Sequence, residues 1–143
     1  MGRDMKRKLA FIKACCWIGV AADLAACVLL VSPDAAGAAF GIGGYVPDGA
    51  YIYASRIGAS LMLGWTFLLA WTAMDPAGRR TILLLTVFPV LSGLLLSSVM
   101  AVSSGFIEIR FMLPLWIFYA LMIPAYLYAY ILTGKTGPGK DSD

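Results

Sequence analysis

The residue of this chain that is best placed to do chemistry is an aspartate, Asp23, inside the first of four long apolar stretches. An ionisable side chain within a membrane span is energetically expensive, and it usually pairs with another group or marks a functional site. Helical periodicity places Cys16, Gly19, Ala26 and Cys27 on the same face as Asp23. All four are small or weakly polar, which predicts that Asp23 faces neighbouring helices and not lipid.

A partner for this carboxylate is available in the second apolar stretch. At a rise of 1.5 Å per residue, Asp23 lies ~12 Å below the outer end of the first stretch, and Arg56 lies ~8 Å deep in the second. These similar depths predict an ion pair between Asp23 and Arg56. Glu108 and Arg110 enter from the same side at the start of the fourth stretch. We therefore expect a polar cluster in the outer half of a helix bundle.

The polar cluster has two interpretations, which the sequence leaves open. As a structural feature, it is an internal salt bridge that fixes the register of the helices. As a binding site, it is a small pocket that is open outward and holds a polar group of a lipid-like molecule. A proton relay through Asp23 has less support, because no second acidic residue lies deeper in the membrane to continue a path.

The rest of the composition argues against catalysis. The chain has no histidine, which excludes His-ligated haem and His-based acid–base chemistry. Cys15, Cys16 and Cys27 all lie in the first stretch, without the C-x-x-C spacing of a thiol redox site. We expect them to pack as small hydrophobic residues. The sequence thus predicts no catalytic residue, no metal site and no cofactor, and it disfavours an enzyme.

The elements that must position these residues are membrane-spanning helices. The 143 residues are 61% hydrophobic and 13% charged, with a mean hydropathy of +0.84. Soluble domains are about 45–50% apolar and about 25% charged. Each stretch has the ~20 residues that a helix needs to cross the hydrocarbon core, and a helix satisfies its own backbone polar groups. The prediction is an all-α bundle of four transmembrane helices at residues 9–31, 51–74, 82–103 and 107–132, with a tail at 133–143. Residues 1–143 then form one integral membrane domain.

Basic residues indicate how the chain is threaded. They cluster at residues 3–8, at residues 79–80 and in the tail, whereas the long loop at residues 32–50 carries only Asp34 and Asp48 as charges. By the positive-inside rule, both termini are predicted to be cytoplasmic, in the inner membrane of a bacterium. A membrane surface accounts for these basic residues, so we expect no nucleic-acid partner.

The amino-terminal segment also resembles two targeting signals. Its basic residues, its apolar run and the Ala-Gly-Ala at residues 36–38 resemble a secretory signal peptide. The Leu-Ala-Ala-Cys at residues 24–27 has the form of a bacterial lipobox. Lys13 and Asp23 interrupt the apolar core that either signal needs, and the apolar run continues past Cys27. We therefore expect an uncleaved first span.

Small residues are expected to form the contact faces between the helices, as they do in membrane bundles. In the third span, a stripe at helical spacing is predicted to pack against the other helices, with its serines facing inward. The stripe consists of Pro89, Gly93, Ser97, Ala101 and Ser104.

Prolines and aromatic residues add two expectations. Pro89, Pro114 and Pro124 lie within predicted spans and should bend their helices locally. Tyr126 and its aromatic neighbours in the fourth span are expected at the inner membrane interface, where amphipathic rings gather.

Short motifs in the first part of the chain resemble those of small bacterial four-helix membrane proteins of the DoxX-like kind. The motifs are Leu30-Val31-Ser32-Pro33, Phe40-Gly41, Ser55-Arg56-Ile57-Gly58, Leu63-Gly64, Asp75-Pro76 and Arg79-Arg80. The resemblance covers roughly the first 80 residues in pattern, and the later spans only in hydropathy. It implies a partner subunit in redox or thiosulfate metabolism, and Arg56 is the one polar residue that it carries over.

These observations favour a small non-enzymatic inner-membrane protein. It would be an accessory subunit, or a module that binds a lipophilic ligand, with a buried Asp23–Arg56 pair. Its expected partners are the lipid bilayer and either further copies of itself or a larger membrane complex. One alternative is a small homo-oligomeric transporter, since small-residue faces permit oligomerisation. A second alternative is a membrane thiol–quinone oxidoreductase, which the adjacent placement of Cys15 and Cys16 disfavours.

Overall fold

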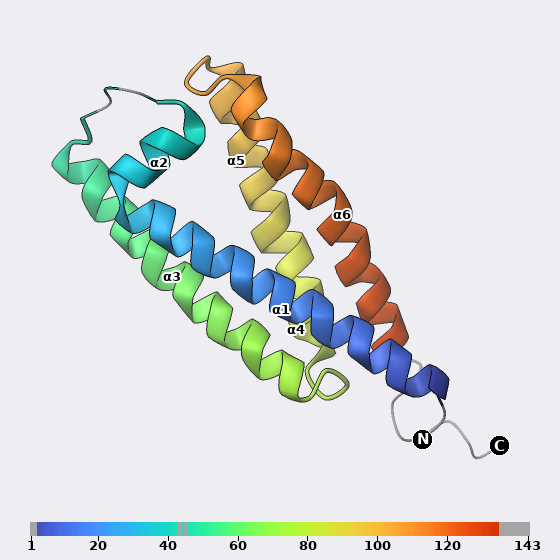
Figure 1. The fold of residues 1–143 in the computed structure, drawn as a ribbon. Coiled ribbons are helices and arrows are strands. Elements are labelled where there is room, and N and C mark those ends of the chain that lie inside the picture. The colour runs from blue at the N-terminus through green and yellow to red at the C-terminus, as the bar shows by residue number, and fades with distance from the viewer. Residues whose placement is uncertain (1–2, 43, 45, 135–143) are drawn as a thin grey trace.

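The computed structural model describes residues 3–42, 44 and 46–134, and every regular element in this part of the chain is a helix. The long single helices are α1 (Arg3–Val31), α3 (Gly49–Met74) and α6 (Ile109–Gly134). Between α3 and α6, the consecutive elements α4 (Arg80–Leu85), η1 (Thr86–Leu91) and α5 (Ser92–Ser103) form one continuous helical rod. A short helix, α2 (Pro33–Phe40), connects α1 to the loop before α3 (Figure 1).

Four helical rods among the described residues are long and apolar enough to cross a membrane. They run over Met5–Val31, Gly49–Met74, Arg80–Ser103 and Ile109–Gly134, and the shortest has 24 residues. Because a span needs about 20 residues, each is sufficient. The predicted all-helical, four-span architecture of a multi-pass membrane protein is thus confirmed. The first helix begins earlier than predicted, at Arg3, and the last continues to Gly134.

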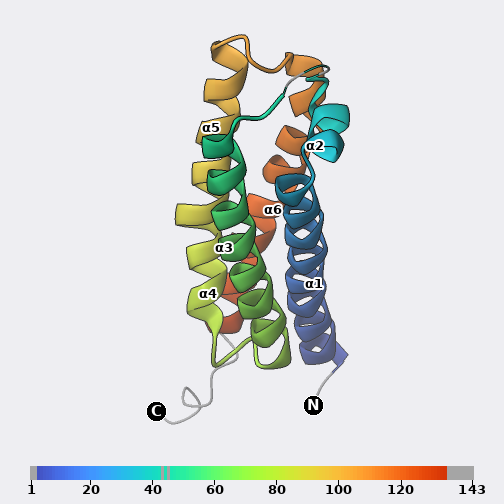
Figure 2. The same cartoon turned by 90° about the vertical axis from the view of Figure 1, so that its left-hand side faces the viewer.

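The four rods are arranged as two pairs. α1 packs along α3, and the rod α4–η1–α5 packs along α6. The two pairs meet where α1 contacts α6 and α3 contacts α4, at the end of the molecule that holds Arg3 and Gly134. Over the described residues, α5 packs against neither α1 nor α3, so the pairs diverge toward the end that α2 occupies (Figures 1 and 2). We call these two regions the terminal half and the α2 half.

The hydrophobic core fills the terminal half. Every rod contributes to it, and its most deeply buried side chains are at most 1% exposed. These are Cys16, Leu69, Leu83, Tyr126 and Ala129. Close packing of this kind holds membrane helices together, since lipid tails are as apolar as the side chains and provide no hydrophobic drive.

Tyr126 links α6 to α1 within this core. Its hydroxyl donates a hydrogen bond to the carbonyl of Cys15 over 3.2 Å. The same hydroxyl lies over Gly19 so closely that any side chain there would collide with it. The predicted place of Tyr126 at the membrane interface is therefore wrong. A buried tyrosine hydroxyl needs an acceptor, and the helix α1 supplies one inside the bundle.

Pro89 distorts the third rod. It lies within η1, which is a π-helical turn. Proline has no N–H for the carbonyl four residues earlier, and its ring crowds that carbonyl, so a wider turn relieves the conflict. The Ser92 hydroxyl donates to the carbonyl of Val87 over 2.8 Å in this turn. In contrast, α6 continues as an α-helix through Pro114 and Pro124.

The small-residue stripe of the third span faces outward, contrary to the prediction. Its exposed members are Pro89, Gly93, Ser97 and Ser104. The inward face carries larger side chains, at Leu83, Val87 and Leu91. These fill the space against α6 better than glycine would. The serine that does turn inward, Ser98, accepts a hydrogen bond from the Trp116 indole over 2.8 Å.

Candidate functional site

The divergence of the two helix pairs leaves an apolar cavity of about 410 Å³ in the α2 half. We call this cavity the cleft. Its lining residues are Ala22, Ala25, Ala26, Leu29 and Leu30 of α1, Ala36 and Phe40 of α2, Tyr51 and Met62 of α3, Leu94 of α5, and Leu115, Phe118 and Tyr119 of α6. None of them is charged. Its volume is within the ~300–1,000 Å³ of small-molecule sites, and its apolar lining is typical of them.

Small side chains on α1 create much of this space. Ala22, Ala25 and Ala26 lie on one side of the helix, because Ala25 and Ala26 are three and four residues after Ala22. In the terminal half, the equivalent space between the pairs is filled by Tyr126 and Leu69, whose side chains reach Gly19. Across the alanines, the side chains of Met62, Phe118 and Tyr119 line the cavity but leave it open.

Helix α2 lies beside the cleft because local signals fix both of its ends. Ser32 is the N-cap, and its hydroxyl accepts a hydrogen bond from the amide of Ala35 over 3.3 Å. Pro33 suits the first turn, where no amide donor is needed. The helix ends at Gly41, whose φ of +67° favours glycine. The ring of Phe111 lies where a side chain at Gly41 would be, which holds this end of α2 against α6.

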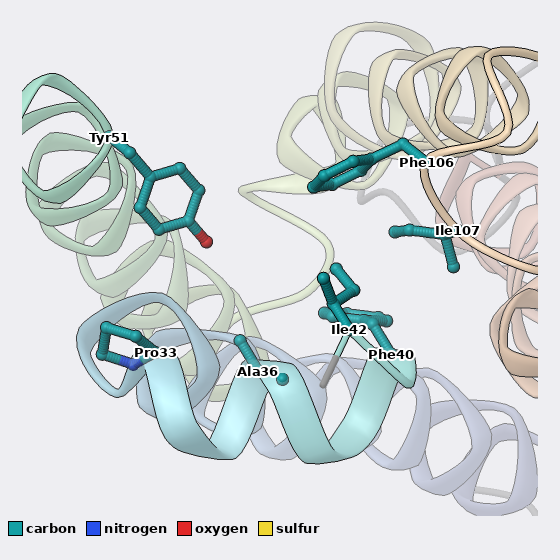
Figure 3. A pocket seen from close by; sticks show the side chains of 8 residues that line it. Pro33, Ala36, Phe40, Ile42, Tyr51, Phe106 and Ile107 are labelled. Atoms are coloured by element: carbon teal, nitrogen blue, oxygen red, sulfur yellow. The ribbon is translucent and has the colours of Figure 1, made fainter. Parts of the chain in front are cut away.

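A second, smaller cavity of about 150 Å³ lies above the cleft, and we call it the vestibule. The two cavities share Ala36, Phe40 and Tyr51 as lining residues. Figure 3 shows the ring of Tyr51 pointing into the vestibule from α3, opposite Phe106 from the turn between α5 and α6. The two cavities are therefore neighbours, with the side chains of Phe40 and Tyr51 bordering both.

Asp23 is next in sequence to the deep end of the cleft, but it is not one of the lining residues. It follows Ala22, the lining residue of α1 that is closest to the terminal half, and it shares a helix face with Leu30, seven residues later. Among the described residues that are not exposed, Asp23 Oδ2 is the one buried side-chain N or O atom without a hydrogen-bond partner. Leaving such an atom unsatisfied costs about 1–3 kcal/mol or more.

Arg56 is not the partner of Asp23. The described part of the chain contains no ion pair between them, and Arg56 is exposed in a separate groove with Cys27 and Ala59. The Cys27 thiol donates to the carbonyl of Ala59 over 3.5 Å, which sets the antiparallel register of α1 and α3. In that register Arg56 is level with Leu30, ~10 Å along the axis from Asp23. The predicted ion pair is wrong because the depths of Asp23 and Arg56 were each counted from the end of its own span, without the register between α1 and α3.

Glu108 and Arg110 do form an ion pair, but away from the cleft floor. Arg110 Nε lies 2.8 Å from Glu108 Oε2, and the two side chains are 68% and 66% exposed. The Arg110 guanidinium also lies over the ring of Phe111, 4.9 Å from its centroid. An exposed pair of this kind stabilises a protein by at most about 1 kcal/mol. The residues of the predicted polar cluster thus lie in three separate places. Asp23 is next to Ala22 of the cleft, Arg56 is in the groove with Cys27, and Glu108 and Arg110 form an exposed pair.

Two of the three cysteines are enclosed by the helices. Cys15 and Cys16 are buried in the terminal half, and all three cysteines are free thiols. Over the described residues, no group of three His, Cys, Asp or Glu side chains is placed to hold a metal ion. The cleft is therefore the arrangement on which a function can be built.

Sequence reasoning singled out Asp23 and left open a small polar pocket there, but it did not identify the apolar cleft between the helix pairs. An apolar lining such as Leu94 or Phe118 has the same composition as a lipid-facing surface, so no local signal distinguishes the two. The helix α2 did have a signal, since Ser32-Pro33 and Gly41 are a helix start and stop at the right spacing. No family model, curated protein or solved structure matches this chain.

Proposed function

We propose that this chain is a non-enzymatic, multi-pass protein of the bacterial inner membrane that binds a lipophilic molecule in the cleft. The observation that carries the proposal is the cavity of about 410 Å³, with uncharged walls from five helices. An empty apolar cavity of this size would forfeit dispersion contacts along all of its walls. A hydrophobic ligand restores these contacts, and the divergence of the helix pairs provides a way in from the α2 half.

In this proposal both termini are cytoplasmic, and the cleft opens toward the other side of the membrane. Arg79 and Arg80 support this threading, since both lie at the terminal half near the start of α1 and its basic residues. Arg79 packs over the ring of Trp71 at 3.8 Å, and Arg80 over that of Tyr130 at 5.5 Å. Such arginine–aromatic contacts suit the headgroup region of a bilayer, where the positive-inside rule places them.

The proposal allows two roles for the protein. In the first, the protein holds the ligand for a partner enzyme, as the DoxX-like resemblance implies for an accessory subunit. In the second, the protein keeps the ligand within a complex formed by its own copies. A thiol–quinone reaction is disfavoured by geometry. Cys15 and Cys16 are enclosed in the terminal half, and the Cys27 thiol bonds to the carbonyl of Ala59. None of the three faces the cleft as a lining residue.

A second candidate function is a small homo-oligomeric transporter. The outward-facing stripe of Gly93, Ser97 and Ser104 favours it, because small exposed residues permit close contact between helices of two copies. The mass of the protein in lipid nanodiscs separates the alternatives. A dimer or a larger oligomer supports the transporter, whereas a monomer excludes this arrangement.

Photolabelling tests the proposed binding site directly. The purified protein in nanodiscs is incubated with a neutral fatty alcohol that carries a diazirine, and the labelled peptides are located by mass spectrometry. We expect labels on cleft residues of α1 and α6, and a loss of most of this labelling in Ala26→Phe, which fills the cleft. Ala14→Phe, on the exposed face of the same helix, is the matched control. Unchanged cleft labelling in Ala26→Phe would contradict the proposal.

A further inference from the structure

A groove between α1 and α3 contains an arginine within a membrane-length helix, and we call it the arginine groove. Its volume is about 280 Å³, and it shares no lining residue with the cleft. Its lining residues are Cys27 and Val31 of α1, and Arg56, Ala59, Ser60 and Leu63 of α3. Among these, Arg56 alone is charged, so the groove combines an apolar wall with one positive group.

No carboxylate neutralises Arg56 over the part of the chain that the structure describes. Glu108 pairs with Arg110, at the start of α6. The Asp48 carboxylate caps α3, where it accepts a hydrogen bond from the amide of Tyr51. An arginine within a span is costly unless an opposite charge or water meets it. The exposed guanidinium of Arg56 is therefore available to an anion from outside the chain.

The register of the two helices places Arg56 near the membrane interface. Because the Cys27 thiol bonds to the carbonyl of Ala59, Arg56 is level with the last residues of α1, which ends at Val31. The span that ends there has 27 residues. Its length of ~40 Å is close to that of a bilayer with its headgroup regions. From Arg56 the groove runs inward to Leu63, ~10 Å deeper along α3.

This combination fits the two parts of a lipid molecule. A guanidinium binds a phosphate through two parallel N–H···O hydrogen bonds, and its positive charge strengthens both. Below it, the side chains of Cys27, Ala59 and Leu63 offer an apolar path for a hydrocarbon chain. A zwitterionic headgroup would also bring an ammonium group, for which the arginine groove has no carboxylate.

We infer that the arginine groove binds an anionic phospholipid from the leaflet on the side of α2. Arg56 holds the phosphate, and one acyl chain lies along the groove. The inference goes beyond the proposed function and does not depend on it, since the cleft is lined by other residues.

Two lipids with identical acyl chains test the preference for negative charge. The full chain in detergent micelles is titrated with phosphatidylglycerol or with phosphatidylcholine, and native mass spectrometry gives the Kd of the first bound lipid. We expect phosphatidylglycerol to bind at least about fivefold more tightly, which is the effect of one basic residue on an anionic lipid. Equal affinities for the two lipids would overturn the inference.

Variants place the effect at Arg56. Arg56→Gln should weaken phosphatidylglycerol binding about fivefold and leave phosphatidylcholine binding unchanged. Arg56→Lys should retain part of the affinity, because an ammonium keeps the charge and loses the two parallel hydrogen bonds. Arg110→Gln is the matched control, since it removes the same charge from an exposed side chain outside the groove. Wild-type affinity of Arg56→Gln for phosphatidylglycerol would overturn the inference.

A second variant obstructs the groove and keeps the charge. Ser60 is exposed one turn after Arg56, so Ser60→Phe covers the path of the acyl chain. We expect it to weaken phosphatidylglycerol binding as well, and it decides the question if Arg56→Gln fails to fold. Unchanged affinity in Ser60→Phe would exclude the groove as the site.

Two further measurements separate the sources of the phosphate and the two sites. Glycerophosphoglycerol has the same headgroup without acyl chains, and we expect it not to displace the lipid. Displacement at equal concentration would show a site for free phosphate esters and would overturn the inference. Ala26→Phe, which fills the cleft, should leave phosphatidylglycerol binding unchanged. A loss of that binding would place the lipid in the cleft, again contradicting the inference.

The neutral diazirine alcohol keeps the two proposals distinguishable. If it fails to label the cleft while the preference for phosphatidylglycerol depends on Arg56, the proposed function is wrong and the lipid site stands. If it labels the cleft and the two lipids bind equally, the reverse holds.

Discussion

The terminal half and the α2 half of this molecule contain the same four rods, yet their interiors differ. In the terminal half, the hydroxyl of Tyr126 packs over Gly19 and donates a hydrogen bond to the carbonyl of Cys15. The space between the helices is therefore filled, and the buried hydroxyl has a hydrogen-bond partner. In the α2 half, the alanines of α1 face a cavity of about 410 Å³, and Asp23 keeps an unpartnered oxygen. The difference shows that side-chain size and polar pairing, not hydropathy, divide this bundle into a close-packed half and an open half.

The largest effect that this comparison predicts is at Gly19. Gly19→Val places a branched side chain against the Tyr126 hydroxyl and Leu69, and we expect it to lower the free energy of unfolding by about 3 kcal/mol, as overpacking does. Gly64→Ala is the control, because nothing lies within 4 Å of the added carbon. SDS titration in mixed micelles measures both. Equal stability of the two variants would contradict a close-packed terminal half.

A pair of leucines contrasts the two halves more directly. Leu83 is 0% exposed in the terminal half, whereas Leu94 lines the cleft. Leu83→Ala should lower the free energy of unfolding by about 2 kcal/mol, near the lower limit for such changes, since lipid adds no hydrophobic drive. Leu94→Ala should cost under about 1 kcal/mol, because its side chain already borders a cavity. The same titration compares them, and a larger loss for Leu94→Ala would reverse the assignment of the halves.

The sequence predicted the four spans because hydropathy and length are sufficient for them. It also singled out Asp23, since a carboxylate within a span stands out. It failed where two helices had to be placed relative to one another. The antiparallel register of Cys27 with Ala59 moves Arg56 away from Asp23, and the outward rotation of α5 turns Ser97 to the surface and Ser98 inward. Both depend on packing between distant segments, which a single sequence does not encode locally.

Two tyrosines on α6 test whether hydrogen bonding stabilises the terminal half more than the α2 half. Tyr126 donates to a carbonyl of α1, so Tyr126→Phe should lower the free energy of unfolding by about 0.6–1 kcal/mol, the usual value of a hydrogen bond between membrane helices. Tyr119 lines the cleft, and Tyr119→Phe should change stability little and act instead on ligand binding. A larger stability loss for Tyr119→Phe in the same titration would show that the cleft wall is structural.

The smallest expected effect concerns Asp23 and Arg56. Because the structure does not join them, a double-mutant cycle of Asp23→Asn and Arg56→Gln should give a coupling energy within about 0.5 kcal/mol of zero, as for independent sites. The free energy of unfolding of the wild type, both single variants and the double variant gives this value. A coupling of 1 kcal/mol or more, by contrast, would restore the predicted ion pair.

The central claim is that the α2 half holds an open apolar cleft, and an experimental structure in lipid nanodiscs tests it most directly. With the diazirine-bearing fatty alcohol present, the account predicts density between the α1–α3 pair and the α5–α6 pair, bounded by Ala26, Leu94 and Phe118. A structure in which α5 closes onto α1, so that side chains fill this space and Asp23 is paired with Arg56, would contradict it.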